Sequence, residues 1–107
     1  RYGTALQVAS ASGHPQFVEI LLSNGADVNA QGGLYGNALQ AASALGHLRI
    51  AEILLLHGAD VNAQGGIHGN ALQAALAKGY KTVTQLLLML DRAISNWQDL
   101  MNTFGQT

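Results

Sequence analysis

The nine-residue sequence GADVNAQGG occurs at residues 25–33 and recurs, 33 residues later, at 58–66. A second block reads YGTALQ at residues 2–7 and returns as YGNALQ at 35–40 and HGNALQ at 68–73. A fixed period of about 33 residues is typical of solenoid proteins, in which each unit packs against its neighbours along the chain. Because solenoids form extended surfaces, the period predicts both a repeat fold and a binding role.

Charge and composition argue against several classes of function. The 107 residues suffice for about three units, which is near the minimum for a stable stack. Five Lys and Arg residues stand against six Asp and Glu, so the chain offers no basic stripe for the phosphates of a nucleic acid. Cysteine is absent, and the longest apolar run, residues 86–90, is too short to cross a bilayer. Because the sequence opens with Arg1 in mid-repeat, we interpret it as a piece of a longer protein.

Each unit carries the signals of two helices. Asn37 lies three residues before Gln40, so each side chain can hydrogen-bond the backbone N–H of the other residue at the start of a helix. This capping box predicts a first helix over residues 38–45, ended by Gly46 in a left-handed conformation, and a second helix over 48–57. Equivalent pairs in the other units are Thr4 with Gln7 and Asn70 with Gln73.

These motifs resemble the ankyrin repeat over about residues 1–90. The agreement covers the Ala-Leu and Ala-Ala pairs of the first helix, a Gly-His turn, a Leu-Leu pair and a Gly-Ala-Asp that ends the unit, at residues 38–39, 41–42, 46–47, 54–55 and 58–60. The resemblance implies an all-α solenoid of helix-turn-helix units with β-hairpin-like connectors. It divides the chain into repeats at 1–33, 34–66 and 67–90, followed by an extra C-terminal helix and tail at 91–107.

The sequence departs from the family's pattern in two places. The family's Thr-Pro-Leu-His tetrapeptide is replaced by Thr-Ala-Leu-Gln or Asn-Ala-Leu-Gln, so we expect the Asn/Gln capping box to replace the family's Thr–His hydrogen bond. Gly32 and Gly65 stand where the connector commonly has Asp. The wording YGNALQAAS is similar to the ankyrin arrays of large fungal multidomain proteins, including receptor-like NTPases.

The third unit lacks the glycine that ends the second helix of the other two. Apolar residues continue instead at steps of three and four residues, the spacing of one helix face, at Val83, Leu87, Leu90, Ile94, Trp97, Met101 and Phe104. One helix could run from residue 81 to about 104 and present Ile94, Trp97, Met101 and Phe104 for docking or self-association. Alternatively the chain bends near Asp91, and residues 93–104 cap the last repeat.

The residue pattern predicts no metal, no cofactor and no enzyme active site. His14 and His47 occupy equivalent positions, which lie about 10 Å apart in a helical stack, whereas zinc needs each ligand atom within about 2.1 Å of one ion. The Gly-Gly pairs follow helices and lack the lysine of a phosphate-binding loop. Ser10 and Ser43 have no His–acid partners at a suitable spacing, so we expect no nucleophile and no small-molecule substrate.

The resemblance implies reversible binding of a protein partner in an intracellular, cytoplasmic setting. Partners of ankyrin arrays mostly contact the connector tips and the exposed end of the first helix, on the concave face. Carried over residue by residue, these positions are Tyr2, Ala11, Ser12, Leu34, Tyr35, Ala44, Leu45, Ile67, His68, Ala77 and Lys78. The alternative is a structural module that pairs copies of itself through the C-terminal helix and the apolar ends of the stack, where Leu6, Val8 and Ala9 would face outward.

Overall fold

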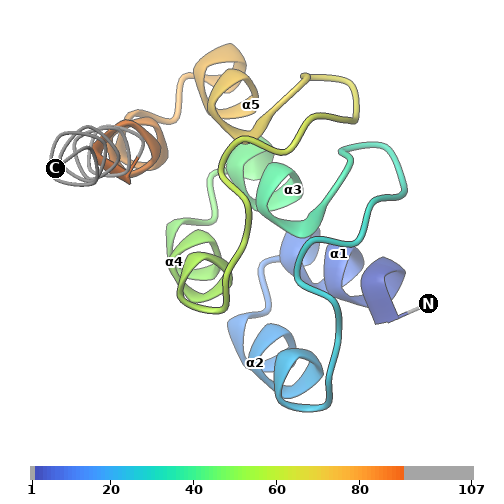
Figure 1. The fold of residues 1–107 in the computed structure, drawn as a ribbon. Coiled ribbons are helices and arrows are strands. Elements are labelled where there is room, and N and C mark those ends of the chain that lie inside the picture. The colour runs from blue at the N-terminus through green and yellow to red at the C-terminus, as the bar shows by residue number, and fades with distance from the viewer. Residues whose placement is uncertain (1, 91–107) are drawn as a thin grey trace, which may run out of the picture.

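In the computed structural model, residues 2–90 are described, with side chains from residue 5, and they form successive pairs of helices joined by long connectors (Figure 1). The first pair is α1 (Tyr2–Ser12) with α2 (Pro15–Ser23), and the second is α3 (Ala38–Leu45) with α4 (Leu48–Leu56). The third begins with α5 (Ala71–Lys78), whose partner is the helical segment 81–90. The C-terminal helix predicted at 91–107 lies outside the described residues.

The helices are arranged in two layers. Helix α3 contacts both α1 and α5, which forms one layer of first helices, and α2 contacts α4 in the layer of second helices. Both connectors project to the same side of the stack, beyond the first helices (Figure 1). This arrangement confirms the predicted all-α solenoid and places the two connector tips next to each other.

Local signals in the sequence set the helix ends. Pro15 begins α2 at a position where a backbone N–H would have no partner inside the helix. Asn37 is the N-cap of α3, and Gly46 ends this helix with φ of 75°, as predicted. At the ends of α2 and α4, the side chains of Asn24 and His57 contact the carbonyl oxygens of Ile20 and Ile53 at 2.8 and 2.9 Å.

The third unit differs at this position. Its second helix still continues at Leu90, the counterpart of His57, which is the C-cap of α4. A leucine side chain cannot accept or donate a hydrogen bond at a helix end, and the next residue is Asp91 where the other units have a glycine. The sequence indicates that the stop signal is missing from the third unit. In agreement, the second helix of this unit does not end at the position where α4 ends, and it is still helical at residue 90, the last described residue.

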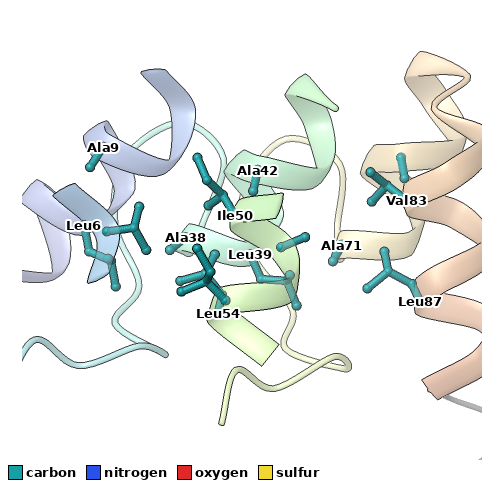
Figure 2. Close-up of a cluster of buried hydrophobic side chains, with 14 residues drawn as sticks. Leu6, Ala9, Ala38, Leu39, Ala42, Ile50, Leu54, Ala71, Val83 and Leu87 are labelled. Atoms are coloured by element: carbon teal, nitrogen blue, oxygen red, sulfur yellow. The ribbon is translucent and has the colours of Figure 1, made fainter. Parts of the chain in front are cut away.

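The core lies between the two layers and runs through all three units. Its largest members include Leu6, Leu39, Ile50, Leu54 and Leu87, each no more than 1% exposed (Figure 2). Alanines on the first helices let the units approach one another closely, because their side chains add almost no width; the buried ones include Ala38, Ala42, Ala71 and Ala75. Small and branched residues therefore alternate along a single continuous core.

The predicted capping boxes have three different outcomes. The box of α3 is complete, because the Asn37 side chain accepts from the Gln40 N–H and the Gln40 side chain accepts from the Asn37 N–H, both at 2.8 Å. In α5 only half forms, since Asn70 accepts from the Gln73 N–H but no return bond is present among the described residues.

The prediction for Thr4 is wrong. Helix α1 begins at Tyr2, so Thr4 lies inside the helix and is not its N-cap. In the later units, the backbone before the cap is held away from a helical path by a bridge between Gly32 and Gly36, or between Gly65 and Gly69. Gly3, the counterpart of Gly36, lies inside α1 and not in such a bridge.

Gln40 has a second role that its place in the capping box does not reveal. While its Oε1 atom closes the start of α3, its Nε2 atom donates to the carbonyls of Ala63, Gly65 and Gly69 at 3.2, 3.0 and 3.1 Å. These carbonyls belong to the following connector. Gln7 does the same one unit earlier, at 2.9 Å to both Ala30 and Gly36. Each of these glutamines therefore fastens the next connector to its own helix.

We predict that Gln40→Ala lowers the free energy of unfolding by about 2–4 kcal/mol, because it leaves buried backbone groups without a partner. Gln73→Ala is the matched control, since Gln73 occupies the same position but is exposed; its expected cost is below about 0.5 kcal/mol. Urea unfolding followed by circular dichroism measures both. Equal losses would show that the bonds to the next connector contribute nothing.

Candidate functional site

Each connector ends in a tight turn that presents one apolar side chain. Antiparallel bridges close the two turns, from the Gly32 N–H to the Gly36 carbonyl at 2.7 Å and from the Gly65 N–H to the Gly69 carbonyl at 2.8 Å. Leu34 and Ile67 lie within these turns and are 61% and 59% exposed. Two aliphatic side chains are therefore exposed to solvent at equivalent positions of the repeat.

The two turns are joined to each other through their backbones. The Ile67 N–H donates to the Leu34 carbonyl at 3.1 Å. Beside this bond, the rings of Tyr35 and His68 stack with centroids 6.5 Å apart and an angle of 17° between their planes. We call these four residues the tip strip. Its exposed side chains belong to a backbone that is fixed by neighbours in the adjacent unit.

The bases of the connectors are joined as well. Asp27 and Asp60 each accept a hydrogen bond from the N–H two residues later, at 3.0 and 2.9 Å, which stabilises a turn. Asn29 connects the two bases, since its amide donates to the Gly58 carbonyl at 3.1 Å and accepts from the Asp60 N–H at 2.7 Å. The tips and the bases are thus both fixed to the neighbouring unit.

An open groove of about 220 Å³ lies between the first tip and helix α1. Gln7 lies in it, and the other side chains that line it are apolar or aromatic, namely Val8, Ala11, Leu34, Tyr35 and Ala41. Val8 is 60% exposed. The equivalent positions in the other units are Ala41 and Ala74, both buried, so Val8 adds an apolar wall that only the first unit has.

The structure leaves most of the predicted contact residues at least partly accessible. Leu34, Tyr35, Ile67 and His68 form the tip strip, Ala77 and Lys78 are exposed at the end of α5, and Leu45 is half-buried at the end of α3. The side chain of Tyr2 lies outside the described residues, as do Ile94, Trp97, Met101 and Phe104. Val8 was not among the predicted contacts on the concave face. Its counterparts in the other units are the small residues Ala41 and Ala74, and this difference in the sequence could have indicated it.

The prediction that Ala44 contacts a partner is wrong. It is fully buried and cannot contact a partner, whereas its counterpart Ala77 is exposed. Helix α3 lies between α1 and α5, which cover both of its flanks, so every residue from 36 to 44 is buried. Equivalent positions in a repeat are therefore not equally accessible when one helix is central and the other lies at an edge.

The remaining polar residues do not assemble a reaction centre in the part of the chain that the structure describes. The His47 ring contacts the Ala11 carbonyl at 3.1 Å. Ser10 and Ser43 are completely buried, so a substrate cannot reach their hydroxyls. No group of three His, Cys, Asp or Glu side chains within residues 2–90 is close enough to hold a metal ion. Over the same residues, every helix is too short or too polar to span a membrane.

The helix pairs, their buried alanines and their projecting connectors define a repeat solenoid of the ankyrin type. A family model for ankyrin repeats in three copies matches residues 6–99, and the chain belongs to this family. No curated protein matches the sequence. Ankyrin repeats are in general protein–protein interaction modules and typically have no catalytic activity.

The rigidity of the tip strip can be tested at two equivalent glycines, Gly33 and Gly66, with φ of 70° and 68°. An alanine at either is strained by about 1–2 kcal/mol. At Gly66 a methyl group would in addition overlap the backbone carbonyl of Tyr35, whereas at Gly33 its nearest neighbour is the end of the flexible Gln7 side chain at 3.3 Å.

We therefore predict that Gly66→Ala costs about 1–3 kcal/mol more than Gly33→Ala. Chemical denaturation measures the difference, and amide NMR shifts at Leu34 and Ile67 show whether the tip has moved. Equal costs together with unchanged shifts would mean that the two tips are not in contact in solution.

Proposed function

We propose that this chain is a non-catalytic module that binds a protein partner across the tip strip and the exposed ends of the first helices. The observation that supports this most directly is the pair of apolar tips, each about three-fifths exposed on a backbone that is hydrogen-bonded to the neighbouring unit. Clustered apolar side chains that remain in solvent mark interaction surfaces. The groove beside Val8 extends the same surface toward α1.

The geometry suits binding because the surface requires little ordering. Association is opposed by the entropy lost when loops and side chains become fixed, at roughly 0.5–1.5 kcal/mol for each flexible side chain. In this chain the hydrogen bond from Ile67 to Leu34 and the hydrogen bonds from the Gln40 side chain, which we call the clamp, fix the connectors before any partner arrives. The free energy from covering the two tips, at about 25 cal/mol per Å² of apolar surface, then remains available for affinity.

Affinity capture from a lysate of the source organism tests the proposal. The intact chain is compared with a Leu34→Ser/Ile67→Ser variant, in which we expect the amount of captured partner to fall at least about tenfold. Leu56→Ser is the matched control, because Leu56 is 83% exposed on α4 in the other layer. All variants are first shown to be folded by circular dichroism. Equal capture by the intact chain and the tip variant would contradict the proposal, and loss only with Trp97→Ala would move the function to the C-terminal segment.

A second candidate function is self-association through the first end of the stack. Phe17 and Ile20 are 61% and 55% exposed on α2, while their counterparts Ile50 and Ile53 are at most 3% exposed. Val8 is exposed on the same end, and the hollow it shares with Phe17 is lined mainly by apolar side chains, together with Ser12 and His14. Leu6, which we expected there, is buried in the core instead, whereas Ala9 is 8% exposed and lines this hollow.

For this second function we predict that the average mass in sedimentation equilibrium rises with protein concentration, and that Phe17→Ser keeps the chain monomeric. Replacing an exposed side chain should change the free energy of unfolding by less than about 0.5 kcal/mol, so the variant remains folded. Trp97→Ala is measured alongside to test the C-terminal segment. A monomeric mass for the intact chain across the accessible concentrations would reject self-association.

A further inference from the structure

Charged side chains are almost absent from the surface that carries the tip strip. Helices α1, α3 and α5 and the tips at 31–37 and 64–70 contain a single ionic residue, Lys78. The other ionic residues between 2 and 90 lie on the second helices or at the connector bases: Glu19, Asp27, Arg49, Glu52, Asp60 and Lys81. The proposed binding surface is therefore neutral over two units and positive at the third.

Lys78 is placed where it can reach a partner. It is exposed in the last turn of α5, and its counterparts in the other units are the uncharged Ser12 and Leu45. Neither α5 nor the tips contain an acidic residue, and among residues 2–90 no carboxylate forms an ion pair with its ammonium group. Lys81, three residues later, is also exposed, and its counterparts Pro15 and Leu48 are again uncharged. Both lysines are thus features of the third unit alone.

The opposite end of the surface disfavours charge. The groove beside α1 is lined by Val8, Ala11, Leu34, Tyr35 and Ala41, and its only side-chain amide, that of Gln7, already donates to the carbonyls of Ala30 and Gly36. An ionic group of a partner placed there would lose water without gaining an opposite charge. An apolar side chain would lose nothing and would cover Leu34.

On the basis of the binding function proposed above, we propose that the partner presents a linear segment with an apolar anchor for the groove and the tips, and an acidic residue for Lys78. The apolar contacts supply most of the affinity, because an exposed ion pair contributes only a small factor. The acidic residue fixes the direction in which the segment lies, since the reversed segment would place its carboxylate in the uncharged groove.

A phage-displayed library of random dodecapeptides, selected on the intact chain, tests this chemistry. The enriched peptides are expected to carry apolar or aromatic residues on one side and Asp or Glu toward one end. A synthetic copy of an enriched peptide is then titrated against three variants by fluorescence anisotropy. Lys78→Glu should weaken binding roughly three- to tenfold at low salt and less at high salt. Arg49→Glu makes the same charge change on α4, in the other layer, and should alter binding less than about twofold.

The third variant, Leu34→Ser/Ile67→Ser, separates the two proposals. If enriched peptides need Leu34 and Ile67 but show no acidic preference or no response to Lys78→Glu, the inference is wrong and the binding function stands. If the peptides bind the tip variant as well as the intact chain, the binding surface itself is misplaced. A library that yields no enriched peptide rejects a linear segment as the partner. Restored binding between Lys78→Glu and a peptide whose acidic residue is changed to Lys would establish the contact.

Discussion

The carboxamide of Gln40 is the interaction on which the arrangement of this chain depends. Its oxygen closes the first turn of α3, and its nitrogen holds three carbonyls of the connector that follows. The connector has few side chains that could shield its backbone from water, so contacts within the connector cannot fix its conformation. The conformation of the projecting connector is therefore fixed by hydrogen bonds from the rigid helix. The positions of Leu34 and Ile67 follow from two such clamps, made by Gln7 and Gln40.

The same arrangement separates the parts of the chain that stabilise the fold from the parts that remain available for binding. Alanines and buried aliphatic residues form the core between the layers, and the polar atoms of the glutamines are used inside the stack. The accessible side chains on this face include the two apolar tips, the rings of Tyr35 and His68, and, within residues 2–90, a single charged residue, Lys78. A change at Leu34, Ile67 or Lys78 can therefore alter recognition with little effect on stability.

Much of this fold could be predicted from the sequence, because its determinants are local. The 33-residue period, the Asn37 cap and the Gly46 stop placed α3 at 38–45, as observed, and α4 within one residue of its observed end. The clamp by Gln40 could not be predicted, since its acceptors lie 23 to 29 residues away. The burial of Ala44 was missed for a related reason: a repeat pattern does not say which copy is enclosed by its neighbours. The geometry of the tips could not be predicted either, because it depends on contacts between one connector and the next.

The clamp has a direction. In each case the donor precedes its acceptors along the chain, as Gln7 holds the connector that leads into α3. Loss of the last unit would therefore leave the bonds from Gln7 to the first connector in place, whereas loss of α1 would remove them. A polypeptide leaves the ribosome in the same order, at about 5–20 residues per second. Each glutamine is thus already in place when the loop that it fastens emerges, so the stack can be completed one unit at a time as it is made.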